Sequence, residues 1–141
     1  SFQSNIVAMI ALTKFALSHM KRGSSIINTA SVTAFKGSNK MVDYGSTKGA
    51  IVSFTRSMAV QLNPKGIRIN SVAPGPVYTP LQPASRPAEQ MEDWGIGEIP
   101  LHGRVAQPAE QAGAYVFCAS HESNMMTGAT IHVNSGQWMG S

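Results

Sequence analysis

The segment SIINTASVTAFKGSNKMVDYGSTK, residues 25–48, decides the fold of this chain because it joins two elements of different hydrophobic period. Its first residues are short and β-branched at the centre, which is typical of a buried strand. From about Asp43 the apolar residues follow helical spacing as far as Leu62, where the NPKG sequence ends the helix. The segment therefore predicts a strand that runs through a loop into a long helix.

The same alternation continues on both sides of this segment. Residues 1–22 have apolar side chains at helical spacing, and IRINSVAP, residues 67–74, is typical of a second buried strand. A proline opens a further helix over residues 108–120, and residues 128–136 form a last strand. This order predicts an α/β fold, a Rossmann-like doubly wound parallel sheet with right-handed crossovers. Three strands and three long helices leave one sheet edge unpaired, so we expect the second half of a longer domain.

Length and composition exclude several classes of protein. The 141 residues suffice for one domain with a core, and 43% apolar against 13% charged residues excludes disorder. No apolar run could cross a bilayer, and no stretch is typical of a signal peptide. Cys118 is the single cysteine, so it has no partner for an internal disulfide. We expect a cytoplasmic protein without a membrane partner.

Charge and histidine spacing argue against nucleic acid and metal. Ten of the eleven lysines and arginines lie in residues 1–88, which could indicate a polyanionic partner or a phosphate-bearing cofactor. However, there is no basic run interleaved with aromatic residues, so solvated faces are the better interpretation and nucleic acid is not expected. The four histidines are scattered and Cys118 stands alone, so no metal site is predicted.

Three residues of the opening segment could carry chemistry. Tyr44 and Lys48 are four residues apart in the predicted helix, so their side chains share one face. An ammonium beside a phenol favours the phenolate, the form in which a tyrosine accepts a proton. Ser31 follows the strand's carboxyl end, where open α/β sheets place their ligand crevice. A Tyr-x-x-x-Lys pair alone also fits an ordinary surface helix, and such a serine also fits a turn.

The surrounding motifs decide between these interpretations. The strand ends in Asn-x-x-Ser (residues 28–31), YGSTK follows, and NSVAPGPVYT (residues 70–79) fits the pattern Asn-x-Val-x-Pro-Gly-x-Val-x-Thr. With the tail from IPLHGRVAQPAEQAGAYVFCAS to TGATIHVNSG, the chain resembles the short-chain dehydrogenase/reductase family over nearly its whole length. Within that family it is most similar to NAD(P)-dependent general oxidoreductases of the glucose/ribitol dehydrogenase type.

The resemblance implies catalytic roles at four positions. Tyr44 would be the acid/base, and Lys48 would favour its phenolate form and bind the nicotinamide ribose. Ser31 would orient and polarise the substrate carbonyl. Asn5 would hold a water in a proton relay to the lysine, although a polar residue facing solvent is the alternative interpretation.

The resemblance also implies binding residues on two loops. Backbone groups near the nicotinamide would come from Pro74, Gly75 and Val77, and Thr79 would bind the carboxamide or the cofactor phosphate. Residues 78–104 would form the substrate loop, because long loops in compact domains are usually functional. Its candidate substrate-binding residues, besides Ser31, are Tyr78, Gln82 and Trp94.

The function implied is an NAD(P)(H)-dependent oxidoreductase acting on CH–OH groups, with a ketone, aldehyde, sugar or polyol as substrate and NADP expected in preference to NAD. The family further implies a homodimer or homotetramer, because its long helices pair between subunits. Residues 1–141 would be the C-terminal half of the domain, since no glycine-rich phosphate loop is present. Two alternatives stay open: a truncated, non-enzymatic interaction module, and an epimerase or dehydratase on the same fold.

Overall fold

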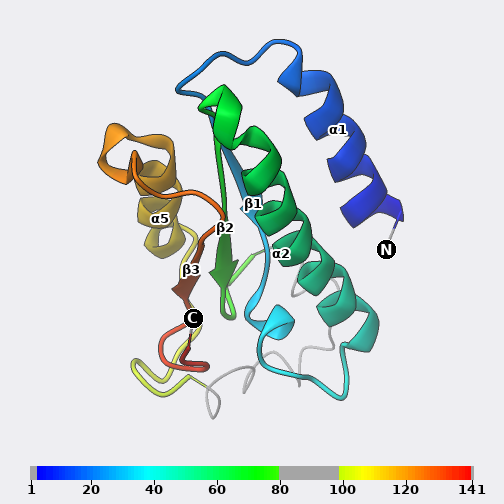
Figure 1. The fold of residues 1–141 in the computed structure, drawn as a ribbon. Coiled ribbons are helices and arrows are strands. Elements are labelled where there is room, and N and C mark those ends of the chain that lie inside the picture. The colour runs from blue at the N-terminus through cyan, green and yellow to red at the C-terminus, as the bar shows by residue number, and fades with distance from the viewer. Residues whose placement is uncertain (1–2, 80–98, 141) are drawn as a thin grey trace.

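The computed structural model describes residues 3–79 and 99–140 and shows a parallel sheet flanked by helices (Figure 1). The strands are β1 (Ser25–Thr29), β2 (Arg68–Pro74) and β3 (Thr130–Val133), and they lie in the order β1-β2-β3. Both strand pairs are parallel, with Ile27 opposite Asn70 and Val72 opposite Ile131. The predicted α/β fold with a parallel sheet is confirmed.

The helix α2 (Val42–Leu62) carries the chain from the carboxyl end of β1 to the start of β2. Asp43 in its first turn is favourable at the positive end of the helix dipole. The helix ends at the 3-10 turn η3 (Asn63–Lys65), after which Gly66 adopts a left-handed φ of 66°. The buried residues of the helix are spaced three or four apart, or adjacent, and so form one face. They are Thr47, Ile51, Val52, Thr55, Ala59 and Leu62.

The helix α5 (Ala109–Ala119), which precedes β3, packs on the opposite face of the sheet from α2 (Figure 1). Side chains alternate between the faces of β1. Ser25 Oγ donates to the carbonyl of Cys118 in α5 at 2.8 Å, whereas Asn28 Nδ2 donates to Thr55 Oγ1 of α2 at 3.1 Å. The chain moves in the same direction across the sheet from β1 to β2 and from β2 to β3. The first connection passes through α2 on one face and the second through α5 on the other face. The two crossovers therefore have opposite hands.

The prediction of right-handed crossovers throughout is therefore wrong for one of the two connections. Handedness is a general preference of β-α-β units, and hydrophobic periods do not reveal the face on which a helix docks. In this structure, polar contacts hold α5 to its face of the sheet. Arg68 of β2 extends to that face and donates to carbonyl groups at the C-terminal end of α5, including those of Cys118 and Ser120.

The N-terminal helix is shorter than its apolar pattern predicts. A π-helical turn η1 (Gln3–Val7) leads into α1 (Ala8–Leu17), rather than one helix over residues 1–22. At the end of the helix the backbone hydrogen bonds join residues three apart instead of four, as from Met20 N–H to the Leu17 carbonyl. Gly23, with a φ of 95°, then turns the chain towards β1. Met20 still packs against the core from this turn, which is why the apolar spacing extends beyond the helix.

Two apolar clusters connect α2 to the sheet. One contains Ala30 and Ala73 at the carboxyl ends of β1 and β2 together with Ile6, Ile51 and Val52, and the other contains Ala59, Leu62, Ile67 and Ile69. Full burial of an aliphatic side chain stabilises a fold by about 1.5–3 kcal/mol. The first cluster therefore holds the strand ends firmly against α2. No helix in residues 3–79 and 99–140 is long and apolar enough to span a membrane.

Candidate active site

Ser31 lies just beyond the carboxyl end of β1, as the sequence predicts. It is the N-cap of the 3-10 helix η2 (Val32–Ala34), with an extended backbone at φ −164° and ψ 156°. Its side chain is buried, and Oγ accepts two hydrogen bonds from Thr33, from the backbone N–H at 3.2 Å and from Oγ1 at 3.0 Å. The serine hydroxyl is therefore held in place at the edge of the sheet where parallel α/β folds bind ligands.

Tyr44 and Lys48 lie on the same face of the first turns of α2. The Lys48 Nζ atom is 5.5 Å from the centre of the Tyr44 ring. The Tyr44 side chain is 37% exposed, so its hydroxyl can meet a ligand, while Lys48 is partly buried. Burial lowers the pKa of Lys48 below its ordinary value of 10.5, because desolvation disfavours the ammonium.

Lys48 also connects α2 to the end of β1. Its ammonium donates to the backbone carbonyl of Thr29 at 3.1 Å. An ammonium has three N–H donors, so this bond leaves capacity for a ligand. Thr29 Oγ1 in turn shares a 2.8 Å hydrogen bond with the hydroxyl of Tyr115 in α5.

The Ser31 segment packs closely against the first turn of α2. A Cβ added at Gly45 would lie 3.1 Å from the carbonyl oxygen of Thr33, closer than most side chains could tolerate. The glycine beside Tyr44 thus allows η2 to approach the helix. Ser31, Tyr44 and Lys48 are brought to one region by two contacts, Thr33 with Gly45 and Lys48 with Thr29.

The predicted cofactor loop follows β2 directly. Gly75 N–H donates to the carbonyl of Val133 at 3.0 Å, and a Cβ at Gly75 would lie 2.9 Å from Asn134 Cα. Val77 forms an isolated parallel bridge with Ala106. Pro74, Gly75, Val77 and Thr79 are all partly buried, and Tyr78 is 48% exposed. The loop is thus fixed against the chain after β3 and against the segment that leads to α5.

Three predicted site residues cannot be placed fully. Asn5 lies in η1, which packs beside α2, but its side chain is outside the described part of the structure. Gln82 and Trp94, the candidate substrate residues, also lie outside the described residues.

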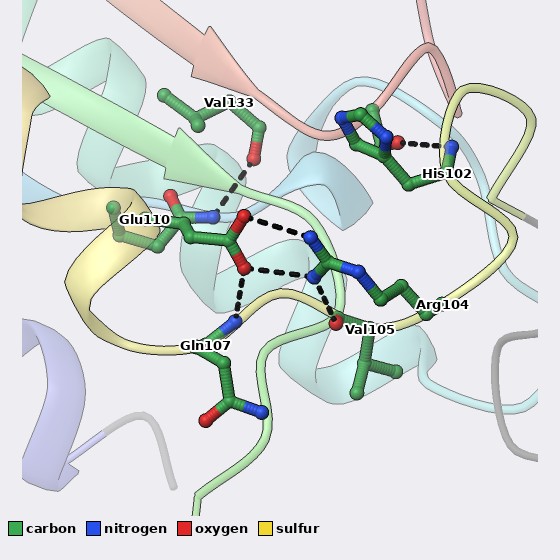
Figure 2. A network of polar contacts seen from close by, with 8 residues as sticks. His102, Arg104, Val105, Gln107, Glu110 and Val133 are labelled. Atoms are coloured by element: carbon green, nitrogen blue, oxygen red, sulfur yellow. Dashed lines mark hydrogen bonds and ion pairs between the residues drawn. The ribbon is translucent and has the colours of Figure 1, made fainter.

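The C-terminal end of the candidate substrate loop is held to α5 by an ion pair (Figure 2). Arg104 donates to both carboxylate oxygens of Glu110 at 2.8 and 3.0 Å, and Gln107 N–H donates to the same carboxylate at 2.9 Å. These hydrogen bonds, that from Arg104 first, lower the pKa of Glu110 to about 2. A pocket of about 200 Å³ lies beside this pair and is lined in part by Gly75, Pro76, Ile99, Leu101 and Gln111.

Sequence reasoning did not single out Thr33 or the Thr29 carbonyl. Thr33 follows Ser31 by two residues, and Ser/Thr side chains at this spacing commonly bond the nearby backbone at turns. The two-residue spacing could therefore have predicted the contact between Thr33 and Ser31. The Thr29 carbonyl gives no sequence signal, because every residue has one.

Comparisons with known proteins identify the family of this chain. Residues 1–137 match the family model described as enoyl-(acyl carrier protein) reductase. Glucose and ribitol dehydrogenase homolog 2 of Arabidopsis thaliana is 54% identical over 136 residues, covering 96% of this chain and 46% of the relative. The chloroplastic NADPH-dependent aldehyde reductase 1 of the same plant is 53% identical over 136 residues, with coverages of 96% and 46%. An uncharacterized oxidoreductase of Bacillus subtilis is 55% identical over 139 residues, with coverages of 99% and 47%.

Solved structures give the same result. A short-chain dehydrogenase/reductase from Brucella melitensis described as a glucose/ribitol dehydrogenase superposes with a TM-score of 0.81 and 36% identity, over 96% of this chain and 52% of that one. A short-chain dehydrogenase family protein from Francisella tularensis gives a TM-score of 0.87 and 30% identity, over 96% and 60%.

Fold and comparisons together define an oxidoreductase class with a Rossmann-type parallel sheet. Within it, the chain belongs to the short-chain dehydrogenase/reductase family. The chain spans about half the length of the curated relatives it matches.

Proposed function

We propose that the protein is an NAD(P)(H)-dependent oxidoreductase that transfers hydride between the nicotinamide and a carbonyl or alcohol substrate. The observation that carries this proposal is the position of Lys48 Nζ, 5.5 Å from the Tyr44 ring, on the helix against which the Ser31 segment packs. A phenol, an ammonium and a hydroxyl at one strand end form a set that can donate and accept a proton at a carbonyl oxygen.

The residues divide the chemistry between them. When bound, the nicotinamide supplies or accepts the hydride. Tyr44 gives a proton to the substrate oxygen during reduction and takes it back during oxidation. Lys48 favours the phenolate of Tyr44 by its positive charge, and Ser31 donates a hydrogen bond to the substrate oxygen. Asn5 would hold a water that relays protons to Lys48.

The donor set of the site suits a nicotinamide riboside. Lys48 uses one N–H on Thr29, and the others can bind the ribose hydroxyls. Pro74, Gly75 and Val77 would present backbone groups to the nicotinamide, and Thr79 would bind its carboxamide or the cofactor phosphate. NADP is proposed in preference to NAD, because one relative is named an NADPH-dependent aldehyde reductase.

The substrate is proposed to be an aldehyde, ketone, sugar or polyol. Relatives named glucose and ribitol dehydrogenase favour the polyol and sugar class, and the aldehyde reductase favours the aldehyde. Tyr78, exposed beside the cofactor loop, would contact the substrate together with Gln82 and Trp94.

A second copy of the chain is the proposed partner in a homodimer or homotetramer. Large apolar side chains on α1 and α2 are exposed, among them Leu12 at 71%, Phe15 at 73% and Val60 at 70%. Burying them between subunits would remove apolar area from water. Light scattering after size-exclusion chromatography tests this proposal, and a strictly monomeric protein would contradict it.

The proposed function is tested with the full-length protein. A panel of aldehydes, ketones, sugars, polyols and an enoyl thioester is assayed with NADPH, NADH and their oxidised forms. The enoyl thioester is included because of the description of the matched family model. Hydride transfer with at least one carbonyl or alcohol is expected. Replacing Tyr44→Phe should lower turnover at least about a hundredfold, the scale of general acid–base catalysis, and leave cofactor affinity nearly unchanged.

Three outcomes would contradict the proposal. A Tyr44→Phe variant with near-wild-type turnover would remove the acid/base assignment. Binding of a partner without any turnover would favour a non-enzymatic interaction module, and an intact mass near 15.0 kDa for the natural protein would support that alternative. Products without net oxidation or reduction would favour an epimerase or dehydratase.

A further inference from the structure

The Ser31 hydroxyl has one hydrogen-bonding role left in this structure, because Thr33 occupies the others. A serine hydroxyl has two acceptor lone pairs and one O–H donor. Ser31 Oγ accepts the Thr33 backbone N–H at 3.2 Å and the Thr33 hydroxyl, whose Oγ1 is 3.0 Å away. With both lone pairs engaged, Ser31 can only donate.

We propose that Thr33 is a positioning residue that fixes the Ser31 hydroxyl as an obligate hydrogen-bond donor to the substrate oxygen. The inference rests on the proposed oxidoreductase function and adds to it a residue that contacts neither substrate nor cofactor. The Thr33 hydroxyl acts through Ser31 alone, by directing the hydroxyl proton of Ser31 away from η2.

If Ser31 can only donate a hydrogen bond, the transfer of the proton to and from the substrate is left to Tyr44. During oxidation the alcohol carbon loses a hydride to the oxidised nicotinamide, and the alcohol oxygen loses its proton. Ser31 cannot accept that proton because its lone pairs are occupied, so the proton passes to the Tyr44 phenolate and the C–O bond becomes C=O. During reduction negative charge develops on the same oxygen, and a hydroxyl that already accepts two hydrogen bonds is a stronger donor to it.

The backbone around Thr33 holds this arrangement. Ala34 N–H donates to the Ser31 carbonyl at 3.0 Å and closes the turn of η2. The Thr33 carbonyl packs against Gly45, where an added Cβ would be 3.1 Å away. The backbone of Thr33 is therefore held against the turn of α2 that carries Tyr44, and its N–H is held against Ser31 Oγ.

The test compares two substitutions of Thr33 with a matched control. Thr33→Val keeps the shape and removes the hydroxyl, whereas Thr33→Ser keeps the hydroxyl. Thr13→Val is the control, because Thr13 is a buried threonine whose hydroxyl donates within α1, to the Met9 carbonyl at 2.8 Å, whereas Thr33 is partly buried and donates to Ser31. All three are made in the full-length protein and assayed with the best substrate of the wild type.

We expect kcat of Thr33→Val to fall about tenfold, the scale of one lost hydrogen bond of about 1.4 kcal/mol. The KM for the carbonyl and the Kd for the cofactor should stay within about twofold, because Ser31 acts mainly on the charge of the transition state. Thr33→Ser should restore kcat to within about twofold of wild type. The pH dependence of kcat/KM should keep its midpoint, because Tyr44 and Lys48 are unchanged.

Specific results would overturn the inference. A Thr33→Val variant with the kcat of the wild type would overturn the inference about Thr33, but it would leave the proposed function intact. The same holds if Thr33→Ser is as slow as Thr33→Val, or if the pH midpoint moves, since either result would indicate a structural disturbance of η2 and α2. If the wild type transfers no hydride with any substrate, the proposed function and this inference fail together.

Discussion

Lys48 Nζ lies 5.5 Å from the centre of the Tyr44 ring and donates a hydrogen bond to the Thr29 carbonyl. The first relationship follows from their four-residue spacing on α2, and the second connects that helix to the end of β1. A charge held between a helix and a strand end has little freedom to move away from the phenol. The proposed role of Lys48 therefore depends on the β1–α2 junction as much as on the motif itself.

Removing this charge should move the pH dependence of the reaction. In Lys48→Met the site loses its cation, so the proton-accepting form of the active site as a whole should require a higher pH. The alkaline rise of kcat/KM for alcohol oxidation should shift upward by about 1 unit or more. Steady-state rates across the pH range, at saturating cofactor, measure the shift.

The control for this variant is Lys48→Arg, which keeps the positive charge. Because burial already lowers the pKa of Lys48, part of its ammonium is lost at alkaline pH, and arginine should stay charged there. The arginine variant should therefore show a smaller shift than Lys48→Met. Equal shifts in both variants would mean that geometry, rather than charge, sets the pH dependence.

Gly75→Ala should destabilise the protein and weaken cofactor binding. The new Cβ would lie 2.9 Å from Asn134 Cα, a backbone atom that cannot move without displacing the chain after β3. Overpacking of this kind costs about 1–3 kcal/mol. Denaturant unfolding gives the stability, and fluorescence titration with NADPH gives the affinity.

Gly113→Ala is the matched control for that variant. Gly113 lies within α5, and apart from the helix's own neighbouring backbone a Cβ there would meet no described atom within 4 Å. Alanine in a helix interior should raise the free energy of unfolding by about 0.5–1 kcal/mol and leave cofactor affinity unchanged. If the two variants lose stability equally, the close approach of Gly75 to Asn134 has no energetic role.

Arg68→Met should lower the free energy of unfolding by at least about 2 kcal/mol, because it leaves several partly buried carbonyls without donors. The guanidinium donates to carbonyls of Cys118, Ser120 and Ser123 and to Ser123 Oγ, and so joins β2 to the C-terminal end of α5. Arg56, exposed on α2, provides the comparison, and Arg56→Met should change stability by less than about 0.5 kcal/mol. Similar losses in both variants would contradict this role.

The fold was predictable because its strands and helices have clear periods and clear end signals. Asn63 to Gly66 end α2 where the sequence predicts, since proline and a left-handed glycine act locally. The face on which α5 packs could not be predicted, because it depends on contacts such as Arg68 with the end of α5, 50 or more residues away. The end of α1 was overestimated because Met20 stays in the core after the helix has ended.

The candidate site was predictable where it depends on local spacing. Four residues place Tyr44 and Lys48 on one helix face, and a strand end places Ser31 at the sheet edge. What the sequence did not reveal is the set of contacts that holds these groups together. The Thr29 carbonyl that binds Lys48, and the approach of Thr33 to Gly45, are backbone features that become specific only in three dimensions.

His132 should make the protein less stable in mild acid. Its ring packs on Phe35 and Trp138 at 4.6 and 4.8 Å between ring centres. Neither ring nitrogen has a hydrogen-bond partner within the described residues. Burial lowers the pKa of His132 below its ordinary value of 6.5, because the charged imidazole would be desolvated.

The sign of the effect follows from proton linkage. Below about pH 6.5 the unfolded chain protonates this histidine while the folded protein does not, so acid favours unfolding until the lower, folded pKa is reached. Well above that pH both states are neutral and His132 has no effect. Free energies of unfolding at about pH 8 and about pH 5 should therefore differ more in the wild type than in His132→Phe. His121→Phe, at an exposed histidine, should behave as the wild type. An equal pH dependence in His132→Phe and the wild type would show that His132 titrates alike in both states.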